Sequence, residues 1–212
     1  MRIRNAASLL WIAAIVYCTA LMAWITLPYL SFKLNVDFLI TKQSIIHLKH
    51  WRFAFYAHIL TSAFVLLAGA VQFWPYFLKQ FKGWHRLIGK AYVFIILFIS
   101  GPAGMIMSFY ANGSWVAKSS FVILSALWLL FTGLSFYYAV HRNFVRHRQF
   151  MIRSYALTLS AITLRLYALV LPHFVFLDGR TEYAILAWSS WTINLLVAEI
   201  IIYSTRKKPV IA

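Results

Sequence analysis

Residues 121–140 read FVILSALWLLFTGLSFYYAV, which is twenty consecutive positions without a charged side chain. At a rise of about 1.5 Å per residue, a helix of this length crosses the roughly 30 Å hydrocarbon core of a bilayer. The segment therefore predicts a transmembrane helix, and with it the class of the whole fold.

Five further apolar runs flank this one. The six expected helices cover roughly 8–30, 53–75, 87–110, 117–140, 150–173 and 183–204. At about 20 residues per span, six helices and their connections nearly exhaust the 212 residues. We expect an all-α, polytopic membrane bundle that forms a single transmembrane domain over residues 1–212. Gly101-Pro102 predicts a kink in the third helix.

The composition supports a lipid environment and excludes several kinds of site. The chain is 63% hydrophobic, has a mean hydropathy of +0.77 and carries charge on 11% of its residues, against about 25% charged residues in soluble domains. Cys18 is the only cysteine, so intrachain disulfides, cysteine zinc sites and iron–sulfur clusters are excluded. The sequence also has no glycine-rich phosphate loop, nucleophile elbow, HExxH motif or acidic cluster. Of the enzyme classes, only an oxidoreductase or electron-transfer component stays open.

The distribution of positive charge predicts the orientation. Thirteen of the twenty Lys and Arg residues fall at the two termini and in the 76–90 and 141–153 connections, six fall on the other side, and Arg165 lies within a helix. By the positive-inside rule, both termini are cytoplasmic in a bacterial inner (cytoplasmic) membrane. These cations lie in short clusters between apolar runs, so we expect them to meet lipid headgroups and not nucleic acid. The longest outer loop, about 31–50, is expected to carry a short interfacial helix.

Polar residues inside a membrane are costly and are therefore the functional candidates. Two coherent faces stand out: His58, Ser62, Val65, Gly69 and Gln72 on the second helix, and His85, Gly89, Tyr92, Ile96, Ser100 and Gly104 on the third. Small and hydroxylated residues at such spacings also serve close helix packing, which we favour for the Gly and Ser positions.

The histidines fall into two layers, as two haem b groups would require. Each haem iron would take one imidazole from each of two helices. The expected ligand pairs are His58 with His173 near the outer side and His85 with His147 near the inner side. Arg165, Arg86 and Arg153 are expected to bind haem propionates or a quinone. Electrons would then pass to or from quinone or a partner membrane protein.

Three alternatives remain open. His47, His50 and His58 predict an outer zinc or copper site, since imidazole suits both metals. Arg165, as an unpaired cation in the outer half of its helix, predicts an anion carrier; Glu199 is too far inward to be its partner. A cofactor-free accessory or scaffold subunit would instead use the cationic inner face to dock partners and lipids, with its histidines as packing residues.

Three motifs resemble a family of bacterial membrane proteins known as a domain of unknown function of the 2306 type. They are His58 with Gly69-x-x-Gln72-Phe73; Trp84-His85-Arg86-x-x-Gly89-Lys90-x-Tyr92; and His147-Arg148-x-Phe150-Met151-Ile152-Arg153-Ser154-Tyr155-Ala156, continuing to Thr163-x-Arg165. The resemblance covers roughly 50–170 and implies a helical bundle with a common site at His58, His85, His147, Arg153 and Arg165. It implies no established activity. The chain is similar to cytochrome b561-like bundles in architecture only, because the histidine spacings do not match.

Overall fold

The computed structural model describes residues 2–174 and 177–206, and every regular element within them is helical. In this part of the chain six segments are long and apolar enough to cross a membrane: Ile12–Ser31, Lys49–Gln72, Lys82–Phe109, Trp115–Val140, Phe144–His173 and Gly179–Thr205. The all-α membrane bundle with six spans is thereby confirmed. The chain divides into two compact units, residues 1–107 and 108–212, which are described separately. The expectation of a single domain stays a prediction.

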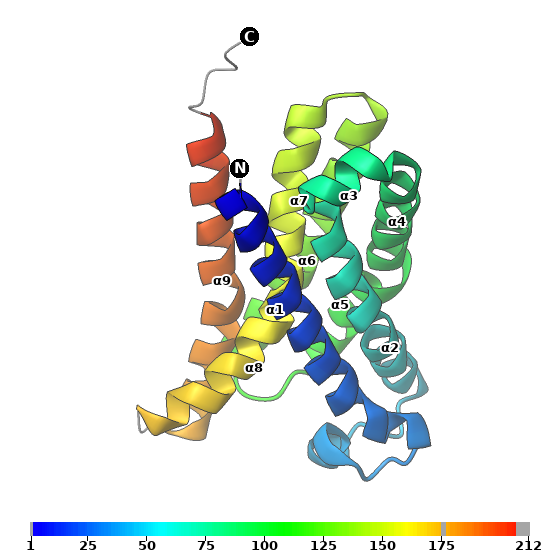
Figure 1. Ribbon diagram of the computed structural model, residues 1–212. Helices are drawn as coiled ribbons and strands as arrows, with labels where there is room; N and C mark the ends of the chain where they lie inside the picture. The colour runs from blue at the N-terminus through cyan, green and yellow to red at the C-terminus, as the bar shows by residue number, and fades with distance from the viewer. Residues whose placement is uncertain (1, 175–176, 207–212) are drawn as a thin grey trace. The chain divides into compact units, whose positions relative to one another are not determined.

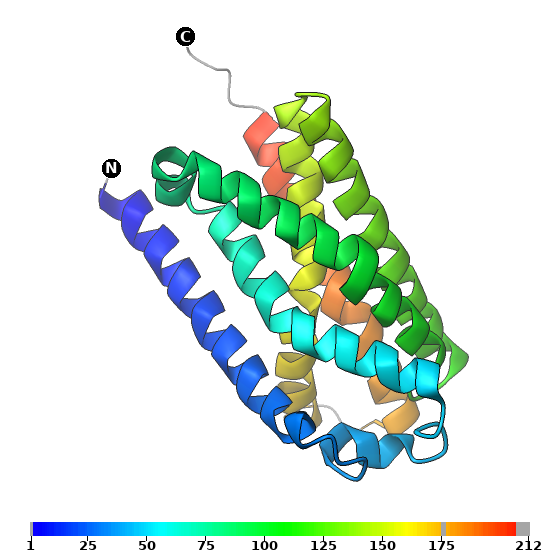
Figure 2. The same ribbon diagram turned by 90° about the vertical axis from the view of Figure 1, so that its right-hand side faces the viewer.

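The first unit is built around α2 (Lys49–Gln72), which packs against α1 (Arg2–Thr26) on one side and α4 (Lys82–Ile95) on the other (Figure 2). The short helix α3 (Pro75–Gln80) connects α2 to α4. Residues before proline avoid the helical region, and Trp74, directly before Pro75, is extended at ψ 112°. The chain therefore turns at this point before it enters α3.

The polar faces expected on the second and third helices pack against each other. A side chain at Gly89 would meet Gln72, and the His58 ring lies against Ser100. The two helices are antiparallel, so these contacts lie near opposite ends of one shared seam. The packing interpretation of the small residues on these faces agrees with this arrangement.

The expected break in the third helix takes the form of a π-helical turn. It covers Ile96–Ser100, between α4 and α5 (Gly101–Phe109), and its last bond runs from the Gly101 N–H to the Ile96 carbonyl. Pro102 has no N–H to donate, so it cannot continue an ordinary α-helical ladder. A π turn at this position places the irregularity beside the proline.

The connection between α1 and α2 folds against the start of α2 through aromatic packing. Two 3-10 helices, Leu27–Ser31 and Asp37–Lys42, take the place of the expected interfacial helix. Phe55 is central: Trp51 stacks on it at 5.5 Å, and Tyr29 meets it edge-on at 5.2 Å. Lys42, although only 4% exposed, lies 5.3 Å from the Phe38 ring centroid, a distance at which cation–π attraction is significant.

The second unit contains α6 (Trp115–Val140), α7 (Phe144–Thr158), α8 (Ser160–Val170) and α9 (Gly179–Arg206) (Figure 1). α6 and α7 form an antiparallel hairpin, and α9 packs against α6, α7 and α8. Gly113, just before α6, has φ +84°, and a Cβ there would lie 2.9 Å from the Tyr183 ring of α9. Glycine adopts this positive φ without strain and, having no Cβ, leaves room for the Tyr183 ring.

Hydroxyl groups join α6 to α7 along the hairpin. Thr132 Oγ1 and Ser154 Oγ are 2.7 Å apart, and the Trp128 indole N–H donates to Thr158 Oγ1 at 3.0 Å. All four side chains are at least nine-tenths buried. Because lipid offers no hydrogen-bond partner, such pairs satisfy polar groups that the helices could not otherwise place inside a membrane.

The fifth span differs from the expectation at both its beginning and its middle. It begins at Phe144 rather than near residue 150, because Asn143 caps α7 by accepting from the Arg146 N–H at 3.1 Å. It then breaks at Leu159. On either side of the break, Thr158 and Ser160 bond back to the carbonyls of Ser154 and Leu157, which bends helices.

Two open glycine positions allow the orientation to be tested. A Cβ added at Gly83 or at Gly179 would meet nothing within 4 Å, so a cysteine fits at either position. In a Cys18→Ser background, Gly83→Cys should react with a membrane-impermeant maleimide only from the cytoplasmic side, and Gly179→Cys only from the outside. Labelling of intact cells against inverted vesicles measures this. The reverse pattern would overturn the predicted orientation.

Candidate functional site

In the first unit, His58 on α2 is anchored by the π turn. Its Nδ1 lies 2.9 Å from the Ser100 carbonyl oxygen and 3.2 Å from Ser100 Oγ. The serine is fully buried and the imidazole is half-buried. His58 is nine residues into α2, or about 14 Å from its start, so it belongs to the membrane-spanning part. The seam between α2 and the third span therefore fixes the orientation of this ring.

The second unit holds another histidine in the same way. Nδ1 of His147, in the first turn of α7, lies 2.9 Å from the Ser135 carbonyl oxygen on α6 and 3.1 Å from Ser135 Oγ. Ser135 is likewise fully buried and His147 half-buried. The helix order differs between the two cases, because His147 lies after its serine in the chain and His58 before. The shared feature is therefore the local contact and not a repeated segment.

These contacts determine where each ring carries its proton. A carbonyl oxygen can only accept a hydrogen bond, so Nδ1 of His58 and of His147 must be the donor. In the neutral imidazole, the lone pair is then on Nε2. Histidines that bind metals or haem iron are held in this manner, with the other ring nitrogen donating to a carbonyl or carboxylate. Either ring is thus prepared to ligate through Nε2.

The other expected ligands differ in how far they are buried. His85 is half-buried on α4, whereas Arg86 beside it is exposed. His173 ends the 3-10 turn after α8 and is exposed. Either expected pair, His58 with His173 or His85 with His147, joins residues of different units. The pairings therefore stay predictions.

Arg153 has a different partner from the one expected. Its Nε and Nη2 donate to the two carboxylate oxygens of Glu199 on α9, at 2.5 and 2.8 Å. The guanidinium also lies 5.0 Å from the Phe150 ring centroid. A cation paired in this bidentate manner is already neutralised, so Arg153 is not available to a propionate. Sequence reasoning missed this pair because Glu199 was considered only as a partner for Arg165.

Arg165 is not the unpaired cation that the carrier hypothesis requires. Its Nη1 donates to the Ala161 carbonyl of its own helix at 2.9 Å, and the side chain is exposed. Glu199 is bound by Arg153, in agreement with the expectation that Arg165 and Glu199 do not pair. The carrier hypothesis therefore stays a prediction.

The outer metal site is not assembled. Among the described residues, no three His, Cys, Asp or Glu side chains come together as a metal site. His47 and His50 are exposed around the start of α2, whereas the His58 ring is directed to Ser100. The side chains of His47, His50 and His58 thus do not converge in this structure, since an HxxH spacing alone does not bring them together, and the zinc or copper hypothesis stays a prediction.

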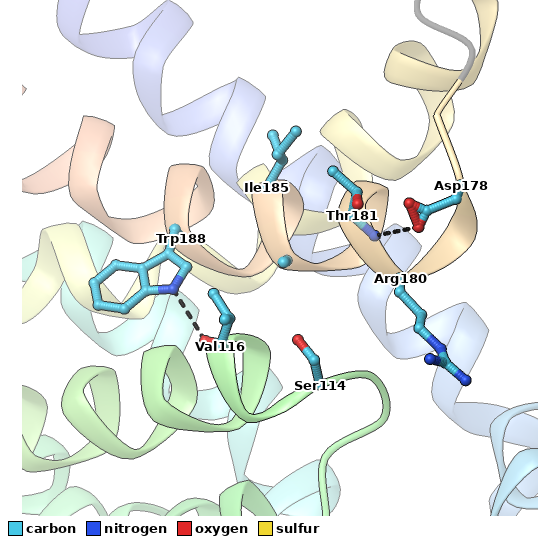
Figure 3. A pocket seen from close by; sticks show the side chains of 8 residues that line it. Ser114, Val116, Asp178, Arg180, Thr181, Ile185 and Trp188 are labelled. Carbon is cyan, nitrogen blue, oxygen red and sulfur yellow. Dashed lines mark hydrogen bonds between the residues drawn. The ribbon is translucent and has the colours of Figure 1, made fainter.

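An open pocket of about 570 Å³ lies between the beginnings of α6 and α9 (Figure 3). Its polar groups already serve the fold: Trp188 Nε1 donates to the Val116 carbonyl at 3.0 Å, and the Thr181 N–H donates to Asp178 Oδ2 at 3.1 Å. Arg180 extends away from the other lining side chains (Figure 3). The remaining lining is mostly apolar, so the pocket suits a hydrocarbon chain better than an ionic cofactor.

Removing the acid of the Arg153–Glu199 pair should destabilise the second unit. Glu199→Gln leaves a guanidinium, whose side chain is 16% exposed, without its counter-charge. We expect a loss of about 2 kcal/mol in the free energy of unfolding, between the values for surface and buried pairs. Denaturation of the detergent-solubilised protein measures it. The double variant Arg153→Met/Glu199→Gln should recover most of the loss, and a double variant as unstable as Glu199→Gln would refute the pairing.

The cap of α9 should open at low pH. Hydrogen bonds from the Thr181 side chain and N–H hold the pKa of Asp178 below its usual value of 3.8. A lowered pKa means that the cap is fully stabilising above the usual value and is lost as pH falls through the lowered one. Protection of the Thr181 amide against hydrogen exchange should therefore drop only below about pH 4. Asp178→Asn, whose amide oxygen caps at every pH, should not show the drop.

Comparison with known proteins assigns the family but no activity. Residues 55–202 match the family model described as "Predicted membrane protein (DUF2306)". No curated protein and no solved structure gave a match. The matched region contains His58, His85, His147 and Arg165, the positions on which the resemblance was first seen, and it covers more than half of the chain. The chain belongs to the DUF2306 family of membrane proteins.

Proposed function

We propose that this membrane protein binds haem b through His58 and His147 and acts as an electron-transfer component of the bacterial cytoplasmic membrane. The observation that carries the proposal is the pair of Nδ1 contacts to the Ser100 and Ser135 carbonyls. These contacts leave Nε2 as the ligating nitrogen and hold the ring against rotation, as haem ligation requires. Haem, when bound, would supply one-electron chemistry.

The positions of the two histidines along their spans support a two-haem arrangement. His58 lies about 14 Å into a helix that starts on the predicted outer side, and His147 lies in the first turn of a helix that starts on the predicted inner side. One ligand thus belongs to each layer of the predicted topology. The proposal retains His173 and His85 as the second ligands and Arg86 and Arg165 as propionate partners, but leaves out Arg153.

A cofactor-free accessory subunit is the second candidate, and one observation favours it. The connection between α6 and α7 and the first two turns of α7 carry the exposed cations Arg142, Arg146 and Arg148, which offer a docking face for anionic lipids or an acidic partner. In this function the His58 and His147 contacts would serve only to hold helices together, as interhelical hydrogen bonds do in membranes.

Replacement of His58 and His147 by asparagine distinguishes the haem-binding function from the accessory function. The Asn amide nitrogen has the same bonded distance from the backbone as histidine Nδ1, so His58→Asn and His147→Asn can keep the bonds to Ser100 and Ser135 while removing Nε2. If haem is bound, the purified wild type is red with a b-type α-band in the reduced-minus-oxidised spectrum. Each single variant should then lose about half of the haem, and the double variant should be colourless.

The controls follow from the same geometry. The variants should keep the elution volume and thermal stability of the wild type, because the interhelical bond is retained. His141→Asn is the matched control, since His141 is exposed and bonds to the Tyr137 carbonyl of its own helix. A colourless, well-folded wild type would refute haem binding and favour the accessory function.

A further inference from the structure

Gln72 is the last residue of α2, at the opposite end of the α2 seam from His58. It carries a buried side-chain amide whose N–H donor is not satisfied within the described residues. The side chain is only 9% exposed. Its Nε2 has no hydrogen-bond partner within the residues that the structure describes. Buried polar groups nearly always have partners, and each exception calls for an explanation. A carboxamide donor at this position is therefore prepared for an acceptor that the described residues do not provide.

The neighbouring helix is shaped around this amide. A Cβ at Gly89 would lie 3.1 Å from Gln72 Oε1, closer than ordinary packing allows. Any larger residue at position 89 would displace the amide. His85 lies one turn earlier on the same face of α4. The glycine and the glutamine thus make one small site on the seam between α2 and α4.

Packing alone does not account for the glutamine. A leucine of similar size would fill the same space without leaving a buried donor unpaired, and it would avoid the desolvation penalty that an unsatisfied buried donor carries. Within the described part of the chain, Trp51 and Tyr56 also carry buried donors without partners, but in them the donor belongs to a ring that packs against Phe55. Gln72 has no ring to contribute to packing, so we take the amide to be the functional group of this side chain.

The chemistry of the site selects a neutral ligand. The cations of this region, Lys82, Arg86 and Lys90, are exposed, and the buried donor is uncharged. An anionic headgroup would lose hydration without a buried counter-charge, whereas a carbonyl oxygen would only exchange one hydrogen bond for another. The occupant must also be soluble in lipid, because the site lies at the end of a membrane span.

We infer that Gln72 donates a hydrogen bond to a carbonyl oxygen of a lipid-soluble quinone, bound at the end of α2 beside Gly89. The choice of a quinone over other neutral carbonyl compounds rests on the proposed function, because a quinone is a lipid-soluble carrier with which a membrane haem exchanges electrons. The site itself is built from Gln72 and Gly89 and does not require haem to be present.

The test measures quinone binding separately from colour. Equilibrium dialysis of the full-length protein in detergent, with a short-chain ubiquinone or menaquinone analogue, should show saturable binding by the wild type. Gln72→Leu should weaken it about tenfold, as expected for the loss of one hydrogen bond, without changing the absorbance spectrum. Gly89→Ala, which shifts the amide without removing it, should weaken binding to a smaller extent. Gln149→Leu, the same change on α7, is the matched control.

The other outcomes overturn either this inference or the haem proposal, and they are distinguishable. Equal binding by the wild type and Gln72→Leu would exclude Gln72 as the donor, and Gly89→Ala decides the matter if the leucine variant fails to fold. No quinone binding, with a phospholipid found by native mass spectrometry on the wild type but not on Gln72→Leu, would assign the site to a lipid ester carbonyl instead. A colourless protein that still binds quinone through Gln72 would refute the haem proposal and leave this one standing.

Discussion

The absence of water in the hydrocarbon core is the constraint on which the rest of this structure depends. Every polar group placed in the membrane must find its partner inside the protein. The chain meets this demand through short interhelical contacts, such as Thr132 with Ser154 and the Arg153–Glu199 ion pair. The His58 and His147 rings obey the same constraint at Nδ1. The proposed functions use two further polar groups, the Nε2 lone pairs of the histidines and the amide of Gln72.

The six spans and the two packed faces of the first unit could be predicted from the sequence, because they depend on local hydropathy and on helical periodicity. The pairing of Ser100 with His58 could also have been predicted, since both residues lie on the polar faces expected for the second and third helices. Ser135 was visible only as one of several polar residues on the fourth span. Its pairing with His147 depends on the register of the α6–α7 hairpin, which local hydropathy and periodicity do not reveal.

Other features depend on three-dimensional contacts that no pattern reveals. Arg153 had been assigned to a connection near the membrane surface, yet α7 begins at Phe144 and carries Arg153 nearly three turns into a helix beside α9. There it reaches Glu199. The break at Leu159 has a related origin, because hydroxyl side chains that look like packing residues also compete for backbone carbonyls.

The π turn at Ile96–Ser100 can be read as a single residue inserted into a helix. Its removal would restore an unbroken α-helix but would rotate one flank by about 100° relative to the other. Ser100 would then leave the face that His58 contacts, while Gly89 would keep its place against Gln72. Evolution can therefore exchange side chains within this turn far more readily than it can shorten it. Deletion of one residue here would therefore break the His58–Ser100 contact at one end of the α2 seam and leave the Gln72–Gly89 contact at the other end intact.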